Sequence, residues 1–195
     1  LREQDRVSLI VYAGRTAMEL PSTSGSNKRE ILAAIDRLVA EGATAGESAL
    51  RMAYGEARKH FIKDGINRIL LATDGDFNVG ISDNDQIVEL IKKERADGIT
   101  LTTLGFGTGN YNEDMMERIA DIGNGNYAYI DSLSEAKKVL VDELSSTFNT
   151  VAKDVKIQVE FNPAQIAEWR LIGYENRVLR EEDFANDKVD AAEVG

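Results

Sequence analysis

The chain contains no cysteine and only one histidine, and these two features limit the chemistry that it can perform. Without cysteine there is no disulfide, no thiolate nucleophile and no thiolate metal site. A single imidazole, that of His60, also excludes a zinc site built from several histidines. Any bound metal would therefore be held by oxygen atoms, which are the ligands that magnesium, calcium and manganese prefer.

Positive charge is scarce, and long apolar runs are missing. Lys and Arg number 23 against 34 Asp and Glu, which gives a net charge of −11. This excess of negative charge argues against binding to nucleic acid or to anionic membrane surfaces. No apolar run is long enough to cross a bilayer, so we expect no direct insertion into a membrane. The length of 195 residues suits one domain of ordinary size with part of a second.

Strand-like and helix-like segments alternate through residues 1–150. Apolar, β-branched runs predict strands at 7–13, 17–20, 69–72, 99–104 and 127–130. Apolar residues at helical spacing predict helices at 27–40, 47–61, 83–98, 115–122 and 133–148. This alternation is typical of an α/β fold with a doubly wound, mostly parallel sheet and helices on both of its faces. The continuous apolar run at 7–13 indicates a strand that is buried on both faces.

The predicted helix at 27–40 has a clear start signal. Asn27 and Glu30 have the spacing of a capping box, in which each side chain bonds the backbone N–H of the other residue. An apolar stripe follows at helical spacing and predicts the inward face of the helix. Its members are Ile31, Ile35, Leu38 and Val39.

The pattern changes near residue 150, where we place a domain boundary. Val155, Ile157, Val159 and Phe161 alternate with polar residues. Such alternation predicts a half-solvated strand of the kind found in antiparallel sheets. We therefore expect an α/β domain at 1–150, followed at 151–195 by the start of a β-rich accessory domain.

The most informative segment is residues 68–78. A short apolar strand, Ile69 to Ala72, delivers Thr73 and Asp74 to its carboxyl end, and Gly75 lets the backbone turn sharply. In open parallel α/β sheets, ligands bind just beyond the carboxyl ends of the strands. Asp74 is therefore a candidate site residue. The structural alternative is a turn aspartate that bonds its own backbone.

Two sequence motifs near this segment fit known sites incompletely. Asp74, Asp76 and Asn78 match the first ligands of an EF-hand calcium loop, but Val79 occupies the position that requires glycine. The glycine-rich run 105–109 follows a strand and precedes a helix, as nucleotide-binding loops do. It lacks the last glycine of the nucleotide-binding fingerprint, so a connecting loop is the simpler interpretation.

An enzymatic alternative also uses Asp74. The pair Asp74 and Asp76 resembles the nucleophile and the acid of the haloacid-dehalogenase phosphatases. That chemistry also needs a lysine to stabilise the phosphate and further magnesium ligands. Lys92 and Lys93 fall in the middle of a predicted helix, and no acidic pair follows a later strand. A magnesium-dependent phosphatase with Asp74 as its nucleophile is the alternative function.

A second candidate ligand lies in the loop between the first two predicted helices. Thr44 stands among small residues, with Gly42 and Gly46 on either side. Its hydroxyl and the carboxylate of Asp74 are hard oxygen groups that suit magnesium, which keeps water at several of its six positions. An open position could accept a carboxylate from a partner. Alternatively, Thr44 is a loop residue or the N-cap of the next helix.

The order of these segments resembles that of the von Willebrand factor type A (VWA) domain. The segments that carry the resemblance are the strand 7–12, the loop 42–44, the strand end 73–75 and the strand 100–107. More narrowly, segments 5–9, 72–80, 105–112, 123–130 and 154–162 resemble a bacterial subgroup with an extra C-terminal region of unknown function. The resemblance implies a Rossmann-like fold and a protein-binding function in adhesion or assembly, without catalysis. It also favours an extracytoplasmic or cell-surface location.

The resemblance further implies a metal-ion-dependent adhesion site (MIDAS). Two of its parts, a loop threonine and a strand-end aspartate, are matched by Thr44 and Asp74. Thr73, Asp76 and Asn78 would hold the ligands in place or touch the partner. Magnesium, or manganese or calcium in its place, would bridge this site to an acidic residue of a protein partner.

The third part of a MIDAS, an Asp-x-Ser-x-Ser motif, does not occur in this sequence. Leu1 to Arg6 would correspond to the end of the family's first helix, so we expect the first strand and its metal loop to precede residue 1. Two oxygen ligands alone should hold magnesium weakly or not at all. Loss of a central strand would also expose the edges of the sheet. A structural or assembly domain with a vestigial metal site is therefore a third interpretation.

Overall fold

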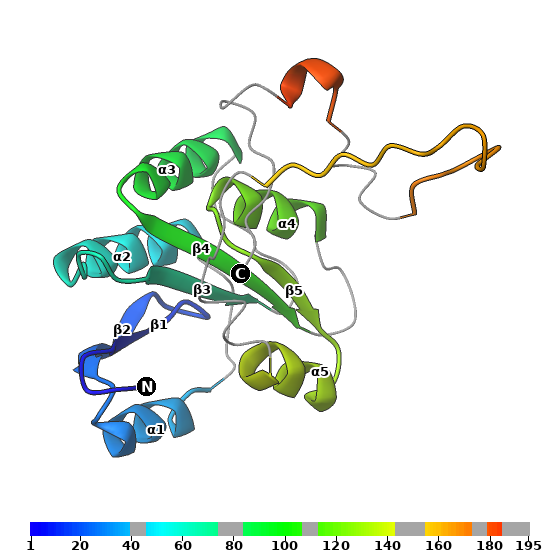
Figure 1. Cartoon of the computed structure of the whole chain (residues 1–195). Coiled ribbons are helices and arrows are strands. Elements are labelled where there is room, and N and C mark those ends of the chain that lie inside the picture. The colour runs from blue at the N-terminus through cyan, green and yellow to red at the C-terminus, as the bar shows by residue number, and fades with distance from the viewer. Residues whose placement is uncertain (40–45, 74–83, 107–112, 143–154, 173–178, 185–195) are drawn as a thin grey trace. The chain divides into compact units, whose positions relative to one another are not determined.

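The computed structural model describes residues 1–39, 46–73, 84–106, 113–142, 155–172 and 179–184. The chain divides into two compact units, Leu1–Leu144 and Ser145–Gly195. The described residues of the first unit form two separate β-sheets and five α-helices (Figure 1).

The first sheet is an antiparallel hairpin of β1 (Arg6–Val11) and β2 (Ala17–Ser24). The expectation that the first strand is buried on both faces was wrong, because Arg6 is exposed and the other residues of β1 are only half-buried. Among the described residues, β1 pairs with β2 alone. β2 runs through Pro21, where the sequence had predicted its end. Pro21 lies at an irregular part of the ladder, between the pairs Val7–Thr23 and Leu9–Leu20, and proline is tolerated at such irregular positions.

The second sheet is parallel, with strand order β3 (Asn67–Thr73), β4 (Ile99–Phe106) and β5 (Tyr127–Ile130). β3 and β4 pair along all 7 residues of β3. The connections between these strands pass through α3 (Asn84–Ala96) and α4 (Glu113–Ile122). The carboxyl ends of the three strands therefore lie along one edge, which we call the carboxyl edge.

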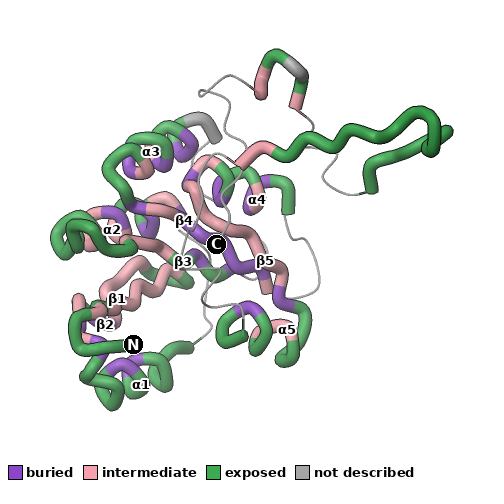
Figure 2. The backbone as a smooth tube through the Cα atoms, in the orientation of Figure 1, coloured by how far each residue is buried: buried purple, intermediate pink, exposed green. Residues whose placement is uncertain are grey.

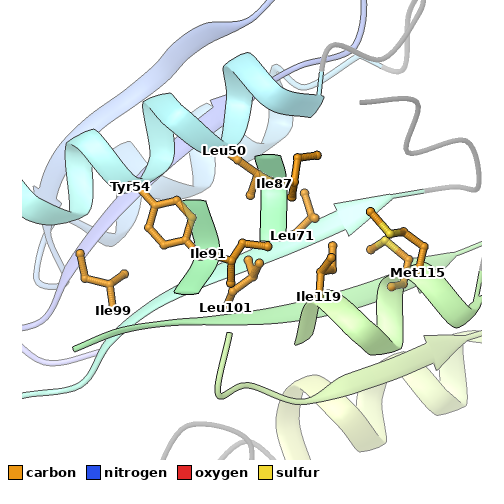
Figure 3. Packing of buried hydrophobic residues seen from close by; sticks show 10 residues of the cluster. Leu50, Tyr54, Leu71, Ile87, Ile91, Ile99, Leu101, Met115 and Ile119 are labelled. Atoms are coloured by element: carbon orange, nitrogen blue, oxygen red, sulfur yellow. The ribbon is translucent and has the colours of Figure 1, made fainter. Parts of the chain in front are cut away.

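Helices cover both faces of the parallel sheet, and this confirms the doubly wound α/β fold expected from the sequence (Figure 1). One face, named the Leu71 face, carries α2 (Gly46–Lys59) with α3 and α4 and holds the main hydrophobic core (Figure 3). The opposite face, named the Leu70 face, is covered at β4 and β5 by α5 (Leu133–Lys137), which continues into a π-helical turn at Lys138–Asp142. On the same side of the molecule, α1 (Lys28–Asp36) packs against the hairpin.

The start of α1 differs from the expected capping box. The side chain of Asn27 makes no cap hydrogen bond, and its amide instead donates to the Glu30 carboxylate at 3.4 Å. Ile31 is buried as predicted, but Ile35 is 46 % exposed, and Leu38 and Val39 are also exposed. Most of the predicted inward stripe therefore faces solvent in this structure.

The last helix of the first unit is shorter than its periodicity suggested. α5 ends at Lys137 and the π-helical turn ends at Asp142, whereas the sequence predicted one helix to residue 148. The residues beyond 142 in that prediction lie outside the described part of the chain. Ala136 packs toward Leu104 and Ile130, whereas Leu140 is exposed.

The second unit lacks the strand predicted at 155–161. Within 155–172 and 179–184 no residue is assigned to a strand, and the one regular element is a 3₁₀ turn at Glu181–Asp183. Ile157 and Val159 are exposed, although the Phe161 ring stacks on that of Trp169 with centroids 5.4 Å apart. Alternating apolar and polar residues define the two sides of a strand, but a strand also needs a second strand to pair with. The described residues of this unit provide no such strand.

Candidate functional site

The carboxyl edge of the parallel sheet is where the sequence placed Asp74. β3 ends at Thr73, which is 6 % exposed and pairs with Gly105 of β4. Thr73 is thus fixed by burial and by the ladder at the last position of the strand. Asp74, Asp76 and Asn78 lie outside the described residues.

The first turn of α2 lies at the same edge. Leu50, in this part of the helix, packs near Leu71, whereas Tyr54, one turn later, lies near Ile99 at the start of β4 (Figure 3). The helix therefore runs antiparallel to the strands, and its first residue, the buried Gly46, is at their carboxyl ends. Thr44 precedes this residue and lies outside the described part of the chain.

The end of β1 approaches the same place. The hydroxyl of Tyr12 donates a short hydrogen bond to the backbone carbonyl of Ala72, next to the end of β3. Thr16, in the turn of the hairpin, shares a hydrogen bond of 2.5 Å between its Oγ1 and the Oγ of Ser48 on α2. These two contacts link the carboxyl end of β1 to β3 and to the start of α2.

The described residues at this edge supply mainly hydroxyl groups, from Tyr12, Thr16, Ser48 and Thr73. Hydroxyl oxygens are hard donors, so they are compatible with magnesium, although they bind it less strongly than carboxylates do. Among the residues whose placement is described, no group of three or more His, Asp and Glu side chains could hold a metal.

Sequence reasoning did not identify Tyr12, Thr16 and Ser48 as neighbours of the site. Thr16 and Ser48 are 32 positions apart in the chain, and no motif links them. The available signal was the position of two of them: Tyr12 directly follows β1 and Ser48 lies in the first turn of α2, and such places meet at the carboxyl edge of an α/β sheet. Thr16, directly before β2, carried no such signal.

The comparison with protein families identifies the fold. A model of the von Willebrand factor type A domain matches residues 1–143. The chain belongs to the von Willebrand factor type A family. A second family model, described as "Uncharacterized protein YfbK, C-terminal", matches residues 146–195. VWA domains are generally protein-interaction modules without enzymatic activity, and many bind a divalent metal at a MIDAS.

A related protein shares the arrangement of VWA and C-terminal regions. The Escherichia coli (strain K12) protein named "Uncharacterized protein YfbK" is 61% identical over 195 residues, which are 100% of this chain and 34% of that protein. The chain thus spans about a third of the length of this relative. No helix within the described ranges is both long enough and apolar enough to cross a membrane.

Two solved structures are similar to the VWA fold of this chain. A von Willebrand factor type A protein from Catenulispora acidiphila has a TM-score of 0.63 and 16% identity, covering 79% of this chain and 36% of that one. Proximal thread matrix protein 1 from the mussel byssus, with a zinc-occupied MIDAS motif, has a TM-score of 0.53 and 19% identity. That match covers 72% of this chain and 36% of the mussel protein. At these identities the likeness shows the fold alone.

Proposed function

We propose that this VWA domain binds a protein partner through a divalent cation held at the carboxyl edge of β3. Magnesium is the expected ion, with manganese or calcium as substitutes, and Thr44 and Asp74 are the expected ligands from this chain. A carboxylate of the partner completes the coordination. The observation that supports the proposal is the buried Thr73 at the end of β3, with the start of α2 at the same edge.

Covalent geometry supports this choice of ligands. Consecutive Cα atoms are about 3.8 Å apart, so Asp74 must follow closely after the fixed Thr73. Thr44 comes two positions before Gly46, whose place at the start of α2 is buried. The two ligands are thus tied to anchor residues at one edge, although they are 30 positions apart in sequence (74 minus 44). We propose that Asp76 and Asn78, which follow in the same segment, contact metal-bound water or the partner.

The charge of the chain explains why a cation is needed for an acidic partner. With a net charge of −11, this protein repels a carboxylate at long range. A bound divalent cation supplies local positive charge that reverses this repulsion at the site. The Thr44 hydroxyl and the Asp74 carboxylate then serve to orient the ion toward the partner.

Titration calorimetry with magnesium and manganese tests the metal site. We expect the complete polypeptide encoded by the gene to bind the ion, and we expect the double variant Thr44→Ala, Asp74→Ala to lose at least tenfold in affinity, or about 1.4 kcal/mol. Asp36→Ala, which removes an exposed carboxylate of α1, is the matched control and should bind normally. Unchanged affinity in the double variant would exclude this site.

Two further readouts separate the competing functions. A partner complex that forms with magnesium and dissociates in chelator supports the adhesion role. Release of phosphate from a phosphomonoester, lost in Asp74→Asn, would instead support the phosphatase. If the complete polypeptide binds neither metal ion, the remaining interpretation is a structural or assembly role with a vestigial site.

The domain limits and the location of the protein are also proposals. We place the VWA domain at 1–150 and the accessory domain at 151–195, and limited proteolysis that cuts near residue 150 tests this boundary. We propose an extracytoplasmic or cell-surface location, in keeping with the family resemblance. Degradation by protease added to intact cells would support that location.

A further inference from the structure

The loop between α2 and β3, residues 60–66, exposes three large apolar side chains. Phe61 is 43% exposed, Ile62 38% and Ile66 54%. Because α2 runs antiparallel to the strands, its end and this loop lie at the edge of the sheet where the strands begin. We call residues 60–66 the amino-edge loop. In Figure 2 the exposed end of α2 and this loop lie at the left, away from the carboxyl edge.

Hydrogen bonds hold the backbone of the amino-edge loop. The Oδ1 atom of Asn67, the first residue of β3, accepts the backbone N–H of Ile62 at 2.9 Å, and its Nδ2 donates to the Ile62 carbonyl at 2.9 Å. The N–H of Gly65 donates to the same carbonyl at 3.1 Å. Asp64 has a φ of +60°, in the left-handed region that aspartate tolerates better than most residues do. The exposed apolar side chains therefore project from an ordered backbone.

Two of the apolar side chains also lie against neighbouring backbone. A Cβ on Gly98 would be 3.4 Å from Cζ of Phe61, so the Phe61 ring packs over the turn between α3 and β4. A Cβ on Gly65 would be 2.7 Å from Cγ2 of Ile62, so the Ile62 side chain lies over the loop itself. A surface that is already ordered loses less conformational entropy when a partner binds to it.

The charges in and beside this loop balance one another. Two cations at the end of α2 have carboxylate neighbours, which are Glu94 for Arg58 and, at 3.7 Å between Nζ and Oε2, Glu56 for Lys59. The loop itself carries Lys63 and Asp64, adjacent in sequence and opposite in sign. Neither has an ion-pair or hydrogen-bond partner for its side chain among the described residues. The surface is thus locally neutral and offers one free charge of each sign.

A second copy of the chain fits this combination of charges. In a two-fold symmetric contact the same patch meets itself, so Lys63 of each copy can pair with Asp64 of the other. A purely acidic or purely basic partner would neutralise only one of the two charges. In a chain with a net charge of −11, a locally neutral patch is also where two copies repel each other least.

We propose that the amino-edge loop is the contact surface of a symmetric dimer. Phe61, Ile62 and Ile66 form its apolar centre, and Lys63 and Asp64 form reciprocal ion pairs beside them. The patch is small, so the dimer is weak and its formation depends on concentration. This contact leaves the carboxyl edge of each copy free. The dimer does not require a metal, so a failure of metal binding would leave this proposal standing.

Sedimentation equilibrium of the complete polypeptide, over a range of concentrations, tests the dimer. We expect the wild type to be in reversible equilibrium between monomer and dimer. Lys63→Glu should weaken the dimer roughly tenfold or more, because carboxylates then meet at both reciprocal contacts. The matched control is Lys28→Glu, the same change of charge at an exposed lysine that begins α1, and it should dimerise as the wild type does.

Exchanging the two charges gives the sharper test. The double variant Lys63→Asp, Asp64→Lys restores complementarity between copies, so its dimer should return to within about threefold of the wild-type affinity. A wild type that stays monomeric at every concentration would overturn the proposal. So would an unchanged dimer in Lys63→Glu, an equal loss in Lys28→Glu, or a double variant that dimerises no better than Lys63→Glu.

Photo-cross-linking locates the contact. Complete polypeptide that carries Ile62→p-benzoylphenylalanine is mixed with an isotope-labelled wild-type copy, so that products between copies differ in mass from products within one copy. We expect cross-links from position 62 to residues 60–66 of the labelled copy. Cross-links that form only within one copy, or that reach other parts of the second copy alone, would overturn the proposal.

Discussion

Arg58 of α2 forms an ion pair with Glu94 of α3, and the Glu94 side chain is only 2% exposed, against 47% for Arg58. One turn earlier on α2, Tyr54 is also buried. Its hydroxyl and the Oε2 atom of Glu94 both lack a hydrogen-bond partner among the described residues. The partly exposed Arg58 thus pairs with a buried carboxylate between two helices of the Leu71 face, and the buried Tyr54 lies one turn earlier on the same helix.

Removal of Arg58 should destabilise the first unit strongly. In Arg58→Ala the buried Glu94 carboxylate loses its ion-pair partner, and breaking a buried pair in this way costs about 3 kcal/mol or more. The matched control is Arg51→Ala, because Arg51 pairs with Glu47 on the exposed side of the same helix. That change should cost only about 0.5 kcal/mol. Urea denaturation measures the free energy of unfolding of both variants. Equal losses of stability in the two variants would contradict the role assigned to Glu94.

Tyr54 should make stability depend on pH in the alkaline range. Burial, together with the negative charge of Glu94, raises the pKa of Tyr54 well above its usual range. The folded protein then holds the tyrosine proton more tightly than the unfolded chain does. The free energy of unfolding should therefore be unaffected by this group at neutral pH and should fall as the pH rises above about 10.

The variant Tyr54→Phe should remove this part of the alkaline dependence. It should be neutral or slightly stabilising at pH 7, because the hydroxyl that it removes has no partner among the described residues. Denaturation curves at several pH values measure both effects. An alkaline slope as steep in Tyr54→Phe as in the wild type would show that another group causes it.

Two glycine substitutions should change the stability of the first unit in opposite directions. A Cβ on Gly125 would lie 2.0 Å from the backbone oxygen of Leu101, so Gly125→Ala must push the loop away from β4. We expect it to cost about 2 kcal/mol or more. A Cβ on Gly55, inside α2, would meet nothing within 4 Å, so Gly55→Ala should add about 0.5–1 kcal/mol through the better helix propensity of alanine. Thermal denaturation should show the two changes on opposite sides of the wild type.

The residues at the starts of α1 and α5 should also differ in how much they contribute to stability. The Ser132 hydroxyl accepts the backbone N–H of Glu135 at 3.2 Å and caps α5, so Ser132→Ala should cost about 1 kcal/mol. Asn27 stands at the start of α1 without a side-chain cap bond, so Asn27→Ala should have a much smaller effect. Chemical denaturation of both variants gives the comparison. A larger loss at Asn27 would indicate that its side chain caps α1 in solution.

Local signals allowed much of the fold to be predicted. Gly98 was expected to end a helix, and it follows α3 with a φ of +86°, a conformation that favours glycine. The strand 127–130 was predicted with its observed limits. Both features depend on a few adjacent residues, so they can be predicted without knowledge of the tertiary structure.

The predictions that failed concern whether another element packs against the apolar side of a segment. The stripe of Ile35, Leu38 and Val39 and the alternation at 155–161 show which side of a segment is apolar. They do not show whether another element packs against that side, and in the described residues none does. The same reason applies to the site. Thr73 could be placed at a strand end, but the approach of Thr16 to Ser48 depends on the packing of a helix against a distant hairpin.

The separation of the hairpin from the parallel sheet has a consequence for the order in which the protein forms during synthesis. β1 and β2 leave the ribosome before α2 and β3, which they contact directly or through Tyr12. Among the described residues made before α2, α1 and the small cluster around Leu20 are what packs on the hairpin, and a two-stranded hairpin is marginal in water. We therefore expect β1 and β2 to become stably folded only after α2 and β3 have been made. During that interval β1 and β2 are exposed to chaperones and to other strands for longer than strands whose packing partners directly precede or follow them in the chain.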